Sequence, residues 1–224
     1  VAHIATDASV RCPIPIRMMD KRKTSRSRVN TRETRQAKPT ILGEGKVTEY
    51  YYFKHLCRLI CCPAEIDKSN FGRKAIGDFE DKIEQVLKGK GSVVVVFDAD
   101  VMASNETERR RLQAIKDKYR NNENVLICDS FPSIEYWFLL HYVDTCKSFS
   151  SAAVVDELSK HVSGYCKDME WAKRERWVAA LRAEGQEQAA RDRAVKYAED
   201  SKQYSDGQSY TNLYKFFDKY PPKA

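Results

Sequence analysis

The sequence predicts an α/β fold, in which a mainly parallel sheet is flanked by helices and followed by a helical C-terminal extension. The segment SVVVVFDAD (residues 92–100) is a run of β-branched residues without polar alternation, which is typical of a strand covered on both faces. A second apolar run, NVLIC (residues 124–128), follows after a charged helical segment. Strand and helix patterns therefore alternate along the chain, as expected for a mainly parallel sheet.

The first predicted elements lie between residues 38 and 62. KPTILG (residues 38–43) has the pattern of a short strand that ends at a glycine. Thr48 is placed to cap a helix over about residues 49–62, and Glu49 stands in its first turn, where the helix dipole favours an acid. Apolar residues recur along this helix at the spacing of one face, which indicates packing against another element. They are Phe53, Leu56 and Ile60.

The same helical spacing returns further along the chain. IGDFEDKIEQVLK (residues 76–88) has apolar positions on one face, and residues 106–120 form a charged helical segment. FPSIEYWFLLHY, which follows the second apolar run, opens a helix at Pro132 or Ser133. With the two apolar strands between them, these helices complete the predicted α/β pattern.

The C-terminal third is predicted to be helical. Residues 151–200 read as a nearly continuous helix interrupted at two glycines, and a last helix begins near Thr211. The chain is thus expected to divide into a core, residues 39–150, and a helical extension, residues 151–224, that packs on it.

All of the net positive charge lies in one N-terminal segment. KRKTSRSRVNTRETRQAK (residues 21–38) contains eight basic residues and one acid. Removing it from the totals of 39 basic and 32 acidic residues leaves 31 of each sign. Because it has no aromatic side chain and a single branched aliphatic one, residues 1–38 are predicted to form a disordered basic arm. This arm is either a solvated tail or a flexible grip on nucleic-acid phosphates. The candidate phosphate-binding residues are Lys21, Arg22, Lys23, Arg26 and Arg28.

Cysteine usage and hydropathy indicate the compartment. The seven cysteines form an odd set without paired CxxC spacing, which favours free thiols in a reducing cytosol. No apolar run approaches the length of a membrane span, and the N-terminus lacks the pattern of a signal peptide. We therefore expect a cytoplasmic protein. Residues 1–17 carry no usable pattern, and Met18 or Met19 is a candidate native start.

The glycine-containing segment ILGEGKVTEYYYF (residues 41–53) is not a P-loop. That loop needs Gly-Lys followed at once by Ser or Thr, whose hydroxyl reaches the metal on the phosphates. Here Val47 follows Lys46. The charge that needs an explanation is therefore Glu44, which stands between the two glycines.

Three acids fall at the ends of predicted strands. Glu44 follows the first strand, and Asp98 and Asp100 end the second. In open parallel sheets, ligands bind outside the carboxyl ends of the strands, and residues two apart on a strand point to the same side. Carboxylates gathered there repel one another unless a cation lies between them. The pattern predicts a Mg²⁺ site of Glu44, Asp98 and Asp100, of the kind that supports phosphodiester cleavage.

Each of these residues also has a simpler interpretation. A D-x-D pattern after an apolar strand is more often a turn or a solvated strand end, and it is also the metal-binding motif of nucleotide-sugar glycosyltransferases. Glu44 and Glu135 could each be an acid that stabilises a helix N-terminus, and Lys46 could be solvated. Their position at the ends of three successive elements favours one shared site.

Three ordered motifs resemble the RloB-like proteins, a family of the TOPRIM superfamily that primases, topoisomerases and OLD-type nucleases share. The motifs are EGKVTEYYYF, VVVVFDAD and DSFPSIEYWFLLHY, and the resemblance covers roughly residues 20–217. The matching positions are Glu44, Gly45, Thr48, Glu49, Tyr52, Phe53, Asp98, Asp100, Ser130, Pro132, Glu135, Trp137, Leu139, Leu140 and His141. Phe131 stands where the family usually has Asn, and Ile134 where it has Phe.

The resemblance implies a TOPRIM-like catalytic core, Mg²⁺ dependence with Mn²⁺ as a substitute, and nuclease activity in bacterial antiviral defence. It implies that Glu44 is the general acid/base and that Asp98 and Asp100 are metal ligands. Glu135 would be a further ligand or a supporting acid. His141 shares an apolar helix face with Trp137 and is more often a core residue than a catalyst at such a place.

Three functions are compatible with these patterns. The first is a metal-dependent nuclease that hydrolyses RNA or DNA, with the basic arm and Lys46 on the nucleic acid. The second is a non-catalytic module that binds nucleic acid or a nucleotide signal within a multi-protein defence complex, which the long helical third favours. The third is a glycosyltransferase. Nucleic acid is the expected partner, together with a partner ATPase or another defence-complex subunit, and no membrane is expected. The three adjacent tyrosines at 50–52 could stack bases.

Overall fold

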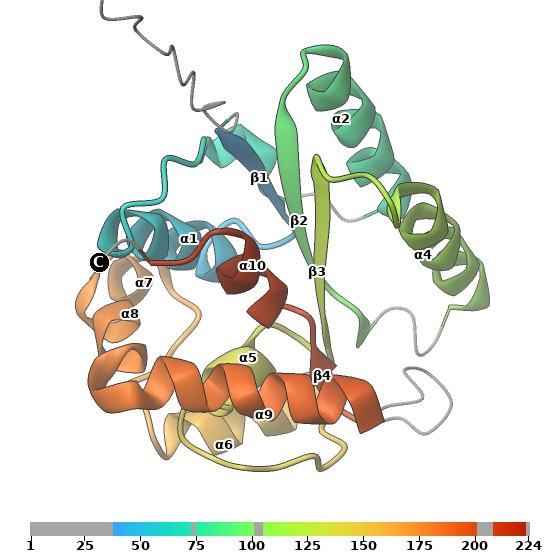
Figure 1. The fold of residues 1–224 in the computed structure, drawn as a ribbon. Helices are drawn as coiled ribbons and strands as arrows, with labels where there is room; N and C mark the ends of the chain where they lie inside the picture. The colour runs from blue at the N-terminus through green and yellow to red at the C-terminus, as the bar shows by residue number, and fades with distance from the viewer. Residues whose placement is uncertain (1–37, 73–74, 101–104, 201–207, 223–224) are drawn as a thin grey trace, which may run out of the picture. The chain divides into compact units, whose positions relative to one another are not determined.

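A sheet with the strand order β1-β2-β3-β4 forms the centre of the fold (Figure 1). The computed structural model describes residues 38–72, 75–100, 105–200 and 208–222. The strands are β1 (Pro39–Gly43), β2 (Ser92–Asp98), β3 (Val125–Phe131) and β4 (Tyr210–Thr211). β1, β2 and β3 run parallel, whereas β4 is antiparallel to β3. The predicted α/β fold with a mainly parallel sheet is therefore confirmed.

The central strand β2 is buried on both faces, which explains its unbroken apolar sequence. Val94 and Val96 pack into one hydrophobic core, while Val93, Val95 and Phe97 pack into the core on the other face. Because side chains alternate along a strand, a strand inside two cores cannot show polar alternation.

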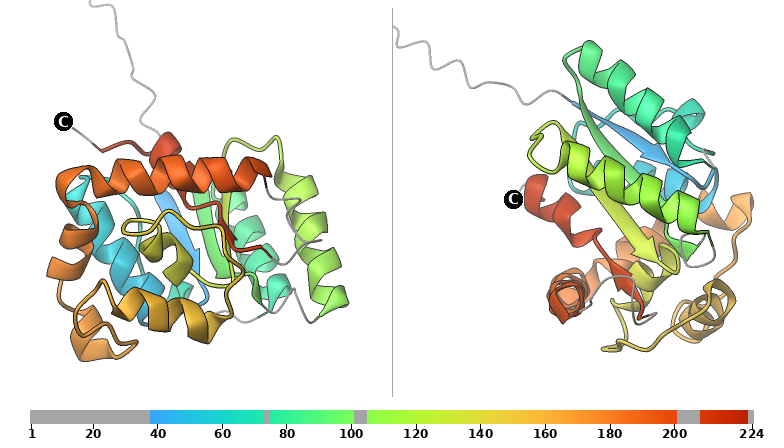
Figure 2. Two further views of the ribbon diagram at one scale, coloured as in Figure 1. Left: turned by 90° about the horizontal axis from the view of Figure 1, so that it is seen from below. Right: turned by 90° about the vertical axis from the view of Figure 1, so that its right-hand side faces the viewer.

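Helices cover both faces of the sheet (Figures 1 and 2). α2 (Ile76–Lys88) and α4 (Glu106–Tyr119) contribute their apolar faces to one core. The other core includes residues of α1 (Thr48–Leu59), α5 (Glu135–Leu139) and α10 (Tyr214–Lys219). The predicted apolar stripe of α1, Phe53, Leu56 and Ile60, is fully buried there.

The C-terminal third is more broken than predicted. It contains α6 (Ser151–Ser159), α7 (Met169–Ala172), α8 (Arg176–Leu181), a 3-10 turn (Ala183–Gly185) and α9 (Gln186–Asp200). The predicted interruption at Gly164 is present but extends over residues 160–168, and the further break between Ala172 and Arg176 was not predicted. Gly164 has a positive φ of 68°, and Asp168 caps α7 by accepting a hydrogen bond from the Trp171 N–H. The predicted division at residue 150 stays a prediction.

Two helix starts also differ from the sequence pattern. Thr48 does not cap α1, because Val47 is the N-cap residue and its side chain makes no capping hydrogen bond. α5 begins at Glu135 rather than at Pro132 or Ser133, since β3 continues to Phe131 and pairs there with β4. The strand β4 was not predicted, because two residues are too short to carry a pattern.

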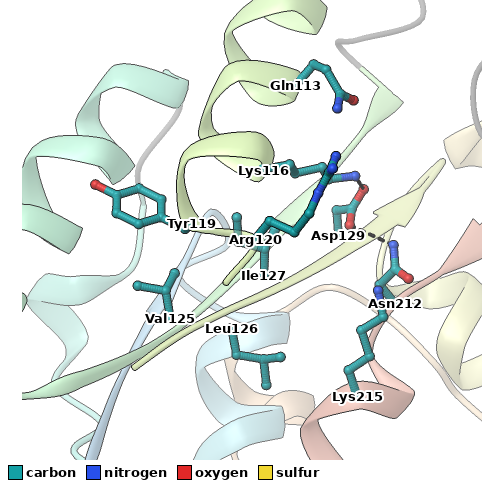
Figure 3. A pocket seen from close by; sticks show the side chains of 10 residues that line it. All are labelled: Gln113, Lys116, Tyr119, Arg120, Val125, Leu126, Ile127, Asp129, Asn212 and Lys215. Carbon is teal, nitrogen blue, oxygen red and sulfur yellow. Dashed lines mark hydrogen bonds and ion pairs between the residues drawn. The ribbon is translucent and has the colours of Figure 1, made fainter. Parts of the chain in front are cut away.

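A buried ion pair ties α4 to β3 at the edge of the sheet (Figure 3). The Asp129 carboxylate is fully buried and accepts hydrogen bonds from Lys116 Nζ at 2.6 Å, Tyr210 Oη at 2.8 Å and Asn212 Nδ2 at 2.9 Å. Asp129, Lys116 and Asn212 border a cavity of about 330 Å³ between α4, β3 and the start of α10. None of the predicted site acids lines this cavity.

Two further predictions concern the basic N-terminal arm and the presence of a membrane-spanning helix. Apart from Lys38, the predicted arm of residues 1–38, including Lys21, Arg22, Lys23, Arg26 and Arg28, lies outside the described residues. Within the part of the chain that the structure describes, no helix is long and apolar enough to cross a membrane.

A carboxylate cluster as the candidate functional site

The ends of β1 and β2 bring two of the predicted acids together. β1 and β2 are parallel neighbours, with Gly43 paired to Val96, so their carboxyl ends lie at the same edge of the sheet. Glu44 follows β1 directly, and its Oε2 accepts a hydrogen bond from the Asp98 N–H at 3.3 Å. Both side chains are partly exposed. The predicted meeting of Glu44 with the end of β2 is thus present in the fold.

Two further acids join this pair. Glu49, in the first turn of α1, is only 5% exposed, and its Oε1 accepts the Gly45 N–H at 2.7 Å. Glu135 begins α5, immediately after Ile134, whose N–H donates to Asp98 Oδ1 at 2.8 Å. The charges of Glu44, Glu49 and Glu135 all act on Asp98. We refer to Glu44, Glu49, Asp98 and Glu135 as the carboxylate cluster.

Simultaneous ionisation of all four acids of the carboxylate cluster is strongly disfavoured. Burial, and then the charges of Glu49, Glu135 and Glu44, hold the pKa of Asp98 well above its usual range. Burial also raises the pKa of Glu49 to about 7, despite hydrogen bonds from the backbone that favour its charged form. Carboxylates that repel one another in this way are stabilised by a proton or by a bound cation.

Gly45 explains how Glu49 enters the cluster. A Cβ atom at position 45 would lie 1.7 Å from Glu49 Oε2, and one at Gly43 would lie 2.4 Å from the ring of Phe71. The glycines beside Glu44 therefore make room for a carboxylate and an aromatic ring.

Glu135 is the most enclosed acid of the cluster. It is 1% exposed, and its Oε2 accepts from Ser133 Oγ at 2.5 Å. Its Oε1 accepts from Tyr165 Oη at 2.9 Å and lies 2.8 Å from Lys167 Nζ. Both donors to Oε1 come from the loop between α6 and α7, thirty residues further along the chain. Burial lowers the pKa of Lys167, but the charge and hydrogen bond of Glu135 outweigh this, so the ammonium is retained.

Asp100 follows the end of β2 and contacts the start of α6. β2 ends at Asp98, so the condition under which both side chains would share one side of a strand is not met. Asp100 Oδ2 instead accepts a hydrogen bond from Ser151 Oγ, at the start of α6, at 2.8 Å. Its assignment as a metal ligand stays a prediction.

The remaining predicted residues lie outside the cluster. Lys46 is exposed and makes no ion pair with a described residue, and its stem crosses Gly72, where a Cβ would lie 2.1 Å from Lys46 Cε. Tyr52 is buried, and its hydroxyl accepts from Trp137 Nε1 at 2.7 Å. Tyr50 is partly exposed, with the Lys54 ammonium 5.6 Å from its ring centre. Of the three tyrosines at 50–52, Tyr50 is therefore the one best placed to stack on a base.

His141 is a core residue. It is 3% exposed, its Nδ1 lies 2.9 Å from the Trp137 carbonyl oxygen, and burial lowers its pKa to about 4. A histidine that is neutral at physiological pH, buried and hydrogen-bonded to a carbonyl oxygen of the preceding helix α5 supports packing rather than chemistry.

The cluster suits a hard cation, but it is not a closed cage. Among the described residues, no three His, Cys, Asp or Glu side chains converge as a group that could hold a metal ion. Mg²⁺ is commonly held by only one or two carboxylates, with waters and substrate phosphates as its other ligands. Glu44 and Asp98 fit this mode because they are adjacent, oxygen-bearing and partly exposed.

Sequence reasoning missed three members of the site. Glu49 was interpreted only as a helix-dipole acid, although its place in the E-G-x-x-T-E motif was a usable signal. Tyr165 and Lys167 had no such signal, because nothing in the local pattern of residues 160–168 marks a loop that reaches Glu135.

The comparisons with known proteins bear on the whole core. The model of the RloB-like protein family matches residues 40–219 of this chain. Neither the search of curated proteins nor that of solved structures gave a match. The family match includes the sheet, the carboxylate cluster and the C-terminal helices. The chain therefore belongs to the RloB-like protein family.

Proposed function

We propose that this protein is a metal-dependent nuclease that hydrolyses phosphodiester bonds of RNA or DNA in bacterial anti-phage defence. The observation that carries the proposal is the adjacency of Glu44 and Asp98 at the carboxyl ends of two parallel strands, within a cluster that favours a cation. Membership of the RloB-like family and the TOPRIM-like order of the motifs support the same class of activity.

Glu44 and Asp98 would hold Mg²⁺, with Asp100 as the third predicted ligand. The metal would supply charge stabilisation and a more acidic water. In hydrolysis, the water oxygen bonds to phosphorus while the bond from phosphorus to the leaving oxygen breaks. Glu44, as the partly exposed general acid/base, takes the proton from the water and returns a proton to the leaving oxygen.

Basic residues outside the cluster would bind the nucleic-acid backbone. Lys46 is exposed two residues after Glu44, and the basic segment of residues 21–38 carries the net charge of the chain. We place this activity in the cytoplasm, in association with a partner ATPase or another subunit of a defence complex.

A second candidate is a non-catalytic module that binds nucleic acid or a nucleotide signal. The observation in its favour is that the other two predicted acids, Asp100 and Glu135, are held by protein side chains from the C-terminal third. Asp100 is hydrogen-bonded to Ser151, and Glu135 to Lys167.

Incubation of the purified full-length chain with end-labelled RNA and DNA, in Mg²⁺, Mn²⁺ or EDTA, tests the proposal. Cleavage should need the metal and should fall by about 10²- to 10⁴-fold in Glu44→Gln, the loss expected for a general acid/base. The double variant Asp98→Asn/Asp100→Asn should be inactive. Glu80→Gln is the matched control, since Glu80 is a partly exposed acid on α2 that pairs with Lys118.

Full activity of Glu44→Gln would contradict the proposal. Metal-independent binding by the wild type, with no cleavage of any substrate, would instead support the binding module.

A further inference from the structure

The loop between α6 and α7 reaches into the carboxylate cluster. Tyr165 is 8% exposed, and its hydroxyl donates to Glu135 Oε1. Lys167, two residues later, brings its ammonium to the same oxygen, while Ser133 holds Oε2. Both oxygens of Glu135 therefore have protein donors. This acid is anchored by the fold rather than open to a ligand.

Lys167 differs from its partner in exposure. The Lys167 side chain is 49% exposed, whereas that of Glu135 is 1% exposed. An ammonium group has three N–H donors, and Glu135 is the one described hydrogen-bond partner of this one. Lys167 thus pairs with a buried acid while its half-exposed ammonium group still has N–H donors that can bind another group.

The charge of Lys167 acts on more than Glu135. It also interacts with Asp98 and Glu49, so the ammonium, which is in direct contact with Glu135, acts on three of the four acids of the carboxylate cluster. A phosphodiester that approaches four carboxylates is repelled, and a cation beside them reduces that repulsion. Lysine is a common point-charge contact for phosphate oxygens.

We propose that Lys167 contacts a phosphate oxygen of the substrate at the carboxylate cluster and stabilises the negative charge that develops there during cleavage. Residues 160–168 are then part of the active site, and the anchoring of Glu135 by Tyr165 and Lys167 fixes the position of that contact. This inference rests on the proposed nuclease function, which it extends to a residue outside the three sequence motifs.

The test compares Lys167→Met, Lys167→Arg and the wild type as full-length proteins. With the substrate that the wild type cuts best, Lys167→Met should lower kcat by about 100-fold, as for loss of a group that stabilises transition-state charge. Lys167→Arg should restore part of kcat because it keeps the positive charge. The melting temperature of each variant reports any loss of folding.

Lys173→Met is the matched control. Its side chain is 46% exposed and pairs with the exposed Glu170 at 2.6 Å, so Lys173→Met removes a similarly exposed ammonium from the same region without uncovering a buried acid. Its kcat should stay within about twofold of the wild type, as expected for an exposed pair.

A second measurement tests the role of Lys167 in phosphate binding independently of nuclease activity. Affinity for a phosphorothioate oligonucleotide that resists cleavage, measured in Ca²⁺, should be weaker for Lys167→Met than for Lys173→Met. If the wild type binds this oligonucleotide but cuts nothing, the nuclease proposal fails, and the binding result alone decides whether Lys167 contacts phosphate.

Three results would overturn the inference. One is wild-type kcat and binding in a folded Lys167→Met. Another is recovery of cleavage in the double variant Glu135→Gln/Lys167→Met, which would show that Lys167 only neutralises Glu135. The third is a wild type that neither binds nor cuts nucleic acid, which would overturn the proposed function as well.

Discussion

At the scale of single residues, Glu49 shows how one carboxylate is both held and destabilised by its surroundings. The Gly45 N–H donates to the Glu49 carboxylate, which occupies the space that a side chain at position 45 would fill. Any other residue at position 45 would therefore displace it. Burial and the charges of Glu135 and Glu44 disfavour its ionised form. A buried carboxyl group with a raised pKa lowers the stability of the folded protein when it is ionised. Such groups are characteristic of functional sites.

Glu49→Gln should stabilise the metal-free protein at alkaline pH. The pKa of Glu49 is raised from 4.5 to about 7 in the folded state, so the native state binds the extra proton. Stability therefore falls as pH rises between these values. The cost above pH 7 is on the order of 1–3 kcal/mol, and glutamine removes it while its Oε1 can still accept the Gly45 N–H.

Thermal melts in EDTA at pH 5 and pH 8 measure this effect. The melting temperature of Glu49→Gln should exceed that of the wild type at pH 8, and the difference should shrink at pH 5. Glu106→Gln, which changes an exposed first-turn acid of α4, is the control. An equal difference in melting temperature at both pH values would contradict the raised pKa of Glu49.

At the scale of elements, the structure depends on side chains that join segments distant in the sequence. Lys116 of α4 and Asn212, just after β4, meet on Asp129 of β3 (Figure 3). Burial raises the pKa of Asp129, but the Lys116 charge and hydrogen bonds from Lys116, Asn212 and Tyr210 outweigh it and leave the pKa below its usual value. The carboxylate thus stays charged inside the protein and ties α4 and β4 to the sheet.

Lys116→Met should destabilise the protein by about 3–5 kcal/mol at pH 7, because it leaves a buried carboxylate without its cation. The folded-state pKa of Asp129 is lowered, so the stability from this ion pair is present above about pH 4 and is lost as pH falls through the lower folded value. Urea unfolding at several pH values should therefore show the difference between variant and wild type narrowing in acid.

The control for this prediction lies one half-turn away on the same helix. Lys118 is 48% exposed and pairs with Glu80 and Glu84, so Lys118→Met should cost no more than about 1 kcal/mol. Equal losses for the two lysines would show that Asp129 does not depend on Lys116.

At the scale of the whole molecule, the candidate site exists only in the folded chain. Its members come from the turn after β1, the first turn of α1, the end of β2, the start of α5 and the loop before α7. Because the unfolded chain cannot bring these groups together, the binding of a divalent cation that we propose for the carboxylate cluster would be coupled to folding.

Mg²⁺ should therefore raise the melting temperature of the wild type. A free Mg²⁺ concentration of 100 times its Kd corresponds to about 2.7 kcal/mol of added stability. Differential scanning fluorimetry across a Mg²⁺ series should show this shift in Glu80→Gln but not in Glu44→Gln/Asp98→Asn. A shift that persists in the double variant would place the cation elsewhere on the molecule.

The sequence by itself determined the main elements and two of the site acids. The apolar run of β2 and the helical spacing of residues 76–88 are local patterns, and both elements formed where they were expected. Glu44 and Asp98 could be placed together because the ends of neighbouring parallel strands necessarily meet. The family resemblance rested on the same motifs and is confirmed.

Only the tertiary structure decided which other side chains share the site. Spacing gives the direction of a side chain only inside a regular element, and β2 stops at Asp98, so Asp100 turns towards Ser151. Glu49 became a cluster acid because the pairing of β1 with β2 brings the start of α1 to the end of β2, where the charge of Glu49 acts on Asp98. Lys167 reached Glu135 because a loop of the C-terminal third folds back over α5. Contacts between distant segments are set by packing, and local periodicity does not encode them.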